Sequence, residues 1–302
     1  MPASENLKRP IRKAVFPVAG LGTRFLPASK SVPKEMLTVV DMPVIQYAVN
    51  EAKEAGIEHF VFVTGRNKNV IEDYFDLQPE LNETLAERKK VEMLELLAKH
   101  QPEAGRTSFT RQQAPLGLGH AVWCARDIVG HEPFALLLPD MVMKSKDKGC
   151  LASMIEVYNE TGGNIIAVEQ TSDEDIPSKG IVAPGEKVAN GFKIEAMVEK
   201  PALKDAPSNL MINGRYILQP EIFSLLENQE TGAGGEIQVT DAMEKLALTQ
   251  DFFGYEFKGQ TFDCGLKEGF IAANVHFALD REDTGPVVRQ TIEDALANLS
   301  SK

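Results

Sequence analysis

Short apolar runs recur along the first half of the chain, and longer segments with helical spacing of apolar residues separate them. Such runs, mostly rich in Val, Ile, Phe and Leu, are typical of strands that are buried on both faces of a sheet. Their alternation with helices predicts a Rossmann-like α/β fold, with a mostly parallel, mixed central sheet flanked by helices. The expected strands are Lys13 to Val18, His59 to Thr64, Thr107 to Arg111, Phe134 to Pro139 and Asn164 to Glu169.

Helical segments are marked by the residues at their ends and by their charge. The first helix is expected to be capped by Asp41, to have Pro43 in its first turn and to end at Gly56. The segment from Glu80 to His100 mixes apolar residues with many charges, and it predicts a solvated helical hairpin on the surface. A shorter helix is expected from His120 to Val129.

The alternation weakens after about residue 169, and a Gly- and Pro-rich region from Ser178 to Gly191 indicates that the chain enters a second half. Near the end, an apolar stripe with helical spacing is expected to pack on its own domain or on a second subunit. That stripe consists of Val288, Ile292, Ala295 and Leu299. The predicted organisation is a flexible N-terminus over residues 1–12, a domain over 13–279 with halves at 13–170 and 171–279, and a linker with a C-terminal helix over 280–302.

Composition limits the class of protein. The 302 residues are 43% hydrophobic and 25% charged, which is enough for a large core. A net charge of -12 argues against nucleic acid or an anionic membrane as partner, because both would repel the surface. Three separated cysteines favour reduced thiols, and the polar first ten residues and the lack of any run of 18 apolar residues argue against secretion and membrane spanning. We therefore expect a cytoplasmic location.

The loop after the first expected strand combines small residues with cations. Glycines at Gly20 and Gly22 would let backbone N–H groups approach phosphate oxygens, and Arg24, Lys30 and Lys34 follow closely. The spacing matches neither a P-loop nor a dinucleotide fingerprint. The loop predicts a pocket for a nucleoside triphosphate, and an ordinary turn with solvated cations is the alternative.

A second glycine-containing segment follows the third expected strand. The side-chain amide of Gln112 is suited to pair with part of a uracil edge. Gly117 and Gly119 would allow the backbone to approach the base or the ribose, or they are simply a turn before the next helix.

Two aspartates are candidates for a metal site. Asp140 follows a buried strand, at the position where ligands of open α/β sheets bind. Mg²⁺ needs few carboxylates when phosphates and water complete its shell, and an acidic protein that binds phosphates is expected to use one. Asp263 precedes Cys264 and Gly265 and is a weaker candidate. Each aspartate is also compatible with an ordinary turn.

Glu199 and Lys200 end another strand-like run and precede Pro201. A carboxylate can bind the hydroxyls of a sugar, and an ammonium can bind a sugar phosphate, provided that the backbone is irregular there. The alternative is an exposed ion pair with no ligand.

The segment AGLGTRFLPASKSVPKEML closely resembles the signature of sugar-1-phosphate nucleotidyltransferases, and in particular that of the bacterial UTP:glucose-1-phosphate uridylyltransferases. The resemblance extends from about Lys13 to Val275, through RQ, GLGHA, VEKP and NGRY segments. It implies a glycosyltransferase-A-like nucleotidyltransferase fold, with a nucleotide half before about residue 170, a sugar half after it, and assembly into a homodimer or homotetramer.

The resemblance also implies roles for individual residues. Catalytic cations would be Arg24, Lys34 and Lys200. Nucleotide contacts would come from Ala19, Gly20, Leu21, Gly22, Thr23, Glu35, Gln112 and Gly117. Sugar contacts would come from Gly180, Glu199 and Asn213, and Mg²⁺ would be bound by Asp140 and Asp263.

Three positions depart from patterns seen in related enzymes. Ala19 stands where thymidylyl- and adenylyltransferases usually carry a second glycine, and Leu116 stands where some relatives have lysine. Lys179 stands where many relatives have tyrosine.

The expected reaction is transfer of UMP from UTP to glucose 1-phosphate, giving UDP-glucose and pyrophosphate. The attacking phosphate oxygen is already anionic and needs no general base, so catalysis is expected to consist of positioning and charge neutralisation. Two alternatives stay open: the same scaffold acting on another triphosphate or sugar phosphate, such as dTTP or mannose 1-phosphate, and a non-catalytic sensor of nucleotide sugars.

Overall fold

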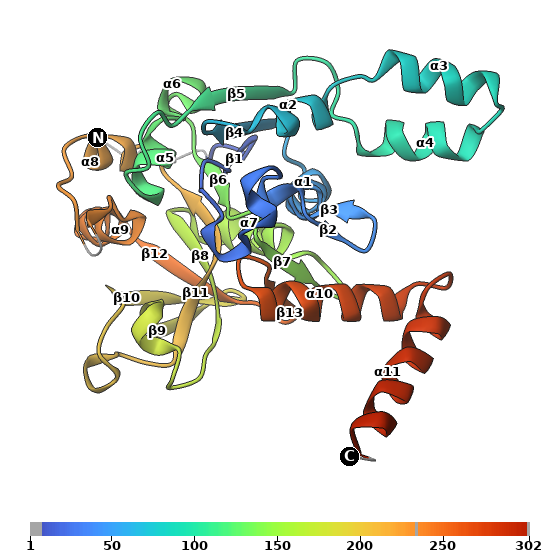
Figure 1. Ribbon diagram of the computed structural model, residues 1–302. Helices are drawn as coiled ribbons and strands as arrows, with labels where there is room; N and C mark the ends of the chain where they lie inside the picture. Colours follow the sequence, from blue (N-terminus) through green and yellow to red (C-terminus); the bar gives the residue numbers. More distant parts are fainter. Residues whose placement is uncertain (1–7, 233–234, 301–302) are drawn as a thin grey trace.

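A mixed sheet runs through the whole structure (Figure 1). The computed structural model describes residues 8–232 and 235–300, and within this part the sheet has nine strands in the order β5-β4-β1-β6-β11-β8-β12-β10-β9. The strands are β1 Lys13–Pro17, β4 His59–Thr64, β5 Thr107–Arg111, β6 Phe134–Leu137, β8 Asn164–Gln170, β9 Gly180–Val188, β10 Gly191–Glu199, β11 Leu210–Leu218 and β12 Phe252–Glu256. All five strands expected from the apolar runs are confirmed.

The direction of the strands divides the sheet. Strands β5, β4, β1 and β6 are parallel neighbours, as expected for the nucleotide half. Strand β11 then enters antiparallel between β6 and β8, although β8 precedes it by about forty residues in the chain. Strands β9 and β10 form an antiparallel ribbon at the far edge. The two expected halves therefore share one sheet.

Helices cover both faces of the sheet (Figure 1). Alternation along β1 directs Ala14 and Phe16 to the core beneath α1, α2 and α7, and Val15 to the core beneath α5, α6, α8 and α9. The helices are α1 Val44–Glu54, α2 Asn69–Phe75, α3 Pro79–Glu87, α4 Val91–His100, α5 Leu118–Trp123, α6 Arg126–Val129, α7 Cys150–Thr161, α8 Ile222–Glu227, α9 Val239–Ala247, α10 Lys267–Asp280 and α11 Gly285–Ser300.

Two small sheets lie beside the main one. Strands β2 (Thr38–Val39) and β3 (Met42–Pro43) form a hairpin before α1, and β7 (Met141–Lys144) pairs antiparallel with β13 (Gln260–Asp263). The second pairing brings residue 263 next to the segment that follows β6, although about 120 residues separate them in the chain.

Several local expectations differ from the structure. Asp41 does not cap α1, because this helix begins at Val44 with Pro43 at the N-cap. The Asp41 carboxylate instead binds the Arg281 guanidinium with two contacts of 2.7 Å. The helix expected over His120 to Val129 is two short helices, α5 and α6. The region from Ser178 to Gly191 forms β9 and the turn into β10, and the register of the two strands shifts on both sides of the Ile194–Pro184 pair.

The ends of the chain also refine the prediction. Residues 1–7 of the expected flexible N-terminus lie outside the described residues, but Ile11 is buried and Tyr158 donates a hydrogen bond of 2.9 Å to the Arg9 carbonyl. The ordered fold thus begins before residue 13.

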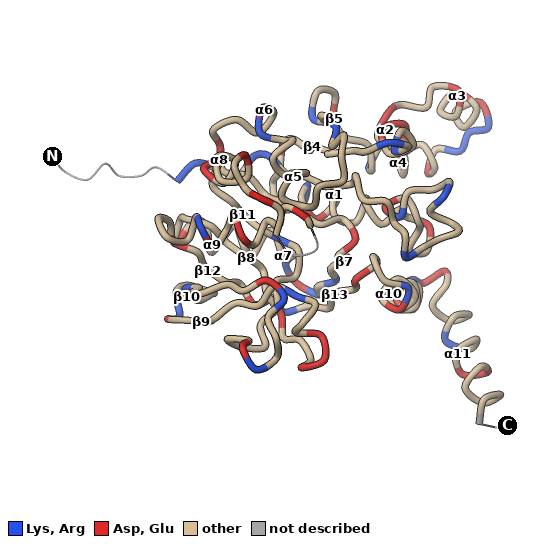
Figure 2. The backbone as a smooth tube through the Cα atoms, turned by 60° about the vertical axis from the view of Figure 1, so that its left-hand side comes forward, with Lys and Arg blue, Asp and Glu red and all other residues tan. Residues whose placement is uncertain are grey.

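At the other end, α10 and α11 are joined by a short turn, and α11 leads away from the body in both views (Figures 1 and 2). No described helix has the length and apolar character needed to cross a membrane.

Candidate active site

The predicted site residues of the first half of the chain follow the carboxyl ends of parallel strands, where ligands of α/β sheets bind. The loop of residues 18–37 leaves β1, Gln112 follows β5, and Asp140 follows β6. The ends of β10 and β13 contribute Glu199 and Asp263 from the second half of the chain.

The loop after β1 is built from three consecutive 3-10 turns, which keep much of its backbone near the surface. Gly22 has a φ of 66°, in the left-handed region that favours glycine, and Ser29 Oγ donates to its carbonyl at 2.7 Å. Gly20, Thr23 and Arg24 are exposed along the same loop. The loop therefore exposes part of its backbone and the Arg24 guanidinium to solvent, beyond the end of β1.

Lys34 and Asp140 form the closest ion pair of the site, with 2.5 Å between Nζ and Oδ2. Burial works against the charged form of Lys34, but Asp140, Glu35 and Asp263 outweigh it and raise its pKa above the ordinary value. Burial also opposes ionisation of Asp140, yet the Lys34 ammonium keeps the pKa of this carboxyl low. Both groups are therefore charged at neutral pH.

Asp140 and Asp263 converge over Gly265. A Cβ atom on Gly265 would lie 2.8 Å from Asp140 Oδ2 and 2.9 Å from Asp263 Oδ1, so both oxygens lie close to one point. The Gly265 N–H also donates to Asp263 Oδ1 at 2.9 Å. The space between the carboxylates exists because residue 265 has no side chain.

This donor set fits a magnesium ion that receives its other ligands from substrate. The two carboxylates supply hard oxygen atoms, and the described residues contain no group of three or more His, Cys, Asp and Glu placed for a metal. Mg²⁺ in such sites usually keeps water and phosphate oxygens in its shell, so two carboxylates are sufficient.

Replacing Gly265 with alanine is expected to lower kcat/KM about tenfold, equivalent to roughly 1.4 kcal/mol of transition-state stabilisation. The added methyl group would push the Asp140 and Asp263 carboxylates apart. Steady-state kinetics at several Mg²⁺ concentrations would measure the loss. Gly149→Ala is the matched control, because its new Cβ would make an ordinary contact of 3.7 Å with Glu51. Equal kinetics for the two variants would contradict the role of Gly265.

A second group of predicted residues lies at the adjoining ends of β9 and β10. Gly180 is paired with Glu199 in the ladder, and a Cβ on Gly180 would approach Glu199 Oε2 to 3.1 Å. Thr240 Oγ1 donates to the same oxygen at 2.7 Å, and Lys200 Nζ lies 3.4 Å from Glu199 Oε1. Lys200 has a φ of 49°, an uncommon value for a residue with a side chain. The backbone irregularity expected at this position is therefore present.

Asn213 lies on β11 and is fully buried. Neither polar atom of its amide has a hydrogen bond of normal geometry within the described part of the chain. The amide is nevertheless near enough to Glu169 to oppose the rise that burial causes in the pKa of that carboxyl. Buried amides without partners are typical of groups that water or a ligand completes.

The glycines of the segment after β5 pack closely against another part of the chain. Gln112 Nε2 donates to the Gly117 carbonyl at 2.9 Å, which ties the amide to this segment. A Cβ on Gly117 would lie 2.8 Å from the Ile237 carbonyl oxygen, and one on Gly119 would meet the same atom at 2.8 Å. Both glycines thus permit close packing against residues 236 and 237, rather than open space for a base on that side.

Comparison with known proteins identifies the family. The nucleotidyl transferase family profile matches residues 13–279. The chain is 48% identical over 273 residues to the UTP–glucose-1-phosphate uridylyltransferase of Bacillus subtilis, covering 90% of this chain and 93% of that protein. The chain belongs to the nucleotidyl transferase family. Its relatives include a second UTP–glucose-1-phosphate uridylyltransferase from Komagataeibacter xylinus, 49% identical over 86% of this chain and 91% of that protein.

Solved structures of the nucleotidyl transferase family show the same fold. UDP-glucose pyrophosphorylase from Acinetobacter baumannii superposes with a TM-score of 0.87 at 45% identity, over 95% of this chain and all of that one. A UDP-glucose pyrophosphorylase complexed with UDP-glucose superposes with a TM-score of 0.81 at 40% identity, over 90% of this chain and all of that one. The expected fold class is thus confirmed.

One predicted contact of this nucleotidyltransferase does not face the site. Glu35 is 1% exposed, and its carboxylate binds Lys68 Nζ at 2.8 Å in a buried ion pair. Burial raises the pKa of Glu35, and the Lys68 and Lys34 ammonium groups act against that shift. Glu35 therefore holds the loop onto the segment before α2, and a nucleotide contact from its side chain is not supported.

The sequence analysis did not select Arg215, although this residue shapes the part of the site that carries Asp140. It is fully buried, and its guanidinium binds Glu51 with contacts of 2.8 and 3.0 Å. The same group donates to the carbonyls of Leu138 and Met141 at 2.9 and 2.7 Å. Arg215 thus fixes both sides of the turn that carries Asp140. An arginine within the apolar run of β11 is the sequence signal that indicates such a role.

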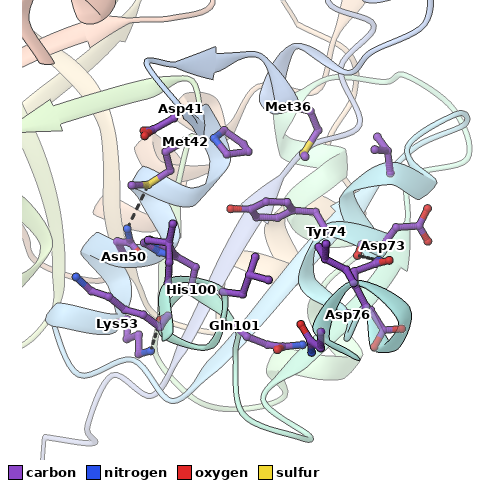
Figure 3. Close-up of a pocket in the computed structure, with 18 of the residues that line it drawn as sticks. Met36, Asp41, Met42, Asn50, Lys53, Asp73, Tyr74, Asp76, His100 and Gln101 are labelled. Carbon is purple, nitrogen blue, oxygen red and sulfur yellow. Dashed lines mark hydrogen bonds between the residues drawn. The ribbon is translucent and has the colours of Figure 1, made fainter. Parts of the chain in front are cut away.

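A large cavity lies away from these residues, beneath the α3–α4 hairpin. Its volume is about 1030 Å³, and its lining includes Met36 and Met42 beside α1 and Tyr74 of α2 (Figure 3). Leu81 and Leu96 from the hairpin also line it and are about half exposed. The cavity contains none of the predicted substrate or metal residues of this nucleotidyltransferase.

Proposed function

We propose that this protein transfers the UMP group of UTP to glucose 1-phosphate, giving UDP-glucose and pyrophosphate. The observation that carries the proposal is the convergence of Asp140 and Asp263 between the loop after β1 and the end of β10. A triphosphate on one side and a sugar phosphate on the other would meet at these carboxylates. Relatives with this named activity, and solved structures of UTP-bound and UDP-glucose-complexed pyrophosphorylases, support the choice of substrates.

In the proposed mechanism, a phosphate oxygen of glucose 1-phosphate attacks the α-phosphorus of UTP in line. The bond from that phosphorus to the bridging oxygen breaks, and the electron pair leaves with pyrophosphate. Arg24 and Lys34 neutralise the leaving group, and Lys200 holds the sugar phosphate beside the triphosphate. No residue needs to remove a proton, because the attacking oxygen is already ionised.

Recognition of the two substrates is assigned to the two ends of the site. Backbone groups from Ala19 to Thr23 bind the triphosphate, and the amide oxygen of Gln112 accepts the imide N–H of uracil. At the other end, Glu199 binds glucose hydroxyls next to Gly180, and Asn213 completes its hydrogen bonds there. Asp140 and Asp263 would hold Mg²⁺, which supplies charge neutralisation for the phosphates.

A pyrophosphate-release assay with each nucleoside triphosphate and each sugar 1-phosphate tests the proposal. We expect the highest kcat/KM with UTP and glucose 1-phosphate. Higher activity with dTTP or mannose 1-phosphate would assign a different member of the same reaction class, since one methyl group or one epimeric hydroxyl changes binding little. No release with any pair would favour a sensor.

The three cysteines are all free, in agreement with a cytoplasmic location.

We also propose that the protein is a homo-oligomer in which α11 of one copy packs against the cavity under the α3–α4 hairpin of another. Val287 and Leu299 on α11 are 68% and 70% exposed, and the hairpin side of the cavity exposes Leu81 and Leu96. Arg281, just before α11, lines the same cavity, so α11 begins beside it. Each copy would then cover the surface of its partner.

Removing residues 285–302 is expected to lower the molar mass measured by light scattering to that of a monomer. Leu96→Lys in the cavity is expected to do the same, because either change removes one partner of the proposed contact. Leu248→Lys is the matched control, since Leu248 is 85% exposed and lies outside the cavity. An unchanged mass for either the truncated chain or the Leu96 variant would exclude this interface.

A further inference from the structure

Lys179 lies between the two halves of the proposed active site. Its carbonyl accepts a hydrogen bond of 2.9 Å from the Lys200 N–H, which fixes it to the sugar side. Its Nζ lies 3.7 Å from Asp263 Oδ2, which places its charge on the metal side. The side chain is 27% exposed, so it is held by the fold but still accessible to a ligand.

The charges around Lys179 alternate in sign. Asp263 faces it directly, and the partly buried Glu169 is near enough to feel its charge. Burial raises the pKa of Glu169, and the Lys179 ammonium acts against this shift. On the far side of Gly265, Lys34 has the same relation to Asp140. Each candidate metal ligand thus lies beside a lysine, and Asp263 also contributes to the raised pKa of Lys34.

The two ion pairs differ in closeness. The contact between Lys34 and Asp140 is 2.5 Å, whereas that between Lys179 and Asp263 is 3.7 Å, beyond normal hydrogen-bond length. A loose, partly exposed pair contributes little stability and can exchange its partner at small cost. A tyrosine at position 179 would place no positive charge beside Asp263.

We propose that Lys179 is a positioning residue with two alternative partners: Asp263 in the ligand-free protein, and the phosphate of the sugar substrate in the loaded enzyme. The second partner, the sugar phosphate, rests on the proposed function. An ammonium beside Asp263 competes with a divalent cation for the same carboxylate. The ligand-free protein therefore binds metal weakly, and the carboxylate becomes available when the sugar phosphate draws Lys179 away.

The second partner follows from the position of Lys179. Glucose 1-phosphate must present an anionic oxygen to an anionic triphosphate, and the two charges repel each other. Lys200 neutralises the sugar phosphate from one side, and Lys179 reaches the same region from the adjoining end of β9. Because this contact forms on binding, it is expected to affect the KM for glucose 1-phosphate more than kcat.

Direct metal binding tests the first half without any turnover. Mn²⁺ is titrated into ligand-free protein and the free ion is measured by electron paramagnetic resonance. We expect Lys179→Met and Lys179→Tyr to bind Mn²⁺ about threefold more tightly than the original protein, whereas Lys179→Arg keeps the weak affinity. Lys193→Met is the matched control, because Lys193 pairs with Asp251 at 2.7 Å on the far edge of the sheet. Thermal unfolding confirms that the variants are folded.

Kinetics test the second half. In Lys179→Met the KM for glucose 1-phosphate is expected to rise about tenfold, with little change in the KM for UTP. In Lys179→Arg the KM for glucose 1-phosphate should stay near that of the original protein. Unchanged or weaker Mn²⁺ binding in both neutral variants would overturn the pairing with Asp263. An unchanged KM for the sugar phosphate would overturn the second partner. If the protein without substitutions were inactive with every substrate pair, the proposed function would be refuted instead. The Mn²⁺ titration would still decide whether Lys179 pairs with Asp263.

Discussion

Replacing Lys200 with alanine is expected to lower kcat by about 10²- to 10³-fold, the range seen when one preorganised electrostatic group is removed from an active site. Its ammonium lies 3.4 Å from Glu199 at the end of β10, and its backbone has a left-handed φ of 49°. Such a conformation is held by the surroundings, here by the hydrogen bond from its N–H to the Lys179 carbonyl. The backbone of Lys200 is therefore held at the position proposed for the two phosphates.

Steady-state kinetics with UTP and glucose 1-phosphate would measure this loss. Lys204→Ala is the matched control, because Lys204 is exposed and lies four residues further along the chain. Since alanine tolerates a left-handed φ less well than asparagine, Lys200→Asn separates loss of charge from backbone strain. Near-normal turnover in both Lys200 variants would refute the assigned role.

Replacing Arg215 with leucine is expected to lower the free energy of unfolding by about 3–5 kcal/mol, the usual result of removing one partner of a buried ion pair. The guanidinium has 0% exposure, and its loss would leave the Glu51 carboxylate and the carbonyls of Leu138 and Met141 without their donor. Urea unfolding would measure the change. Activity is expected to fall as well, because the turn with Asp140 would lose its anchor.

Two further variants make the Arg215 result specific. In the double variant Arg215→Leu, Glu51→Met, part of the lost stability is expected to return, because no unpaired carboxylate remains buried. Arg12→Leu removes half of an exposed pair with Glu58, and it should change the unfolding midpoint little. If Arg215→Leu were as stable as Arg12→Leu, the buried ion pair would not be a major contribution to the fold.

The features that could be predicted from sequence depend on neighbouring residues. Strand runs such as His59 to Thr64, the glycine loop after β1 and the aspartate after β6 are each defined within about ten residues. The helical hairpin over residues 80–100 was likewise readable from its mixture of charge and apolar spacing, and it is confirmed as α3 and α4. Local pattern and local chemistry agree in these segments, so the sequence is informative there.

The features that were missed depend on partners far along the chain. Glu35 is buried because Lys68 lies against it, 33 residues away. Gly117 packs against residue 237, and Arg215 binds Glu51 across 164 residues. The charged side chains of Glu35 and Arg215 would suit a ligand equally well, and a glycine at position 117 suits either close packing or a ligand contact. Tertiary contacts decide between the two uses.

The position of β11 has a consequence for exchanging parts between related enzymes. Strand β11 forms hydrogen bonds with both β6 and β8. In a chimera joined at residue 170, β6 and β8 would come from one parent and β11 from the other, so these two pairings would combine strands of different enzymes. The β9–β10 ribbon, residues 180–199, lies at the sheet edge and carries Gly180, Glu199 and part of the sugar end. Grafting this ribbon with Lys179 from one family member to another would exchange part of the sugar end, provided that the graft keeps the pairings of β9 with β11 and of β10 with β12.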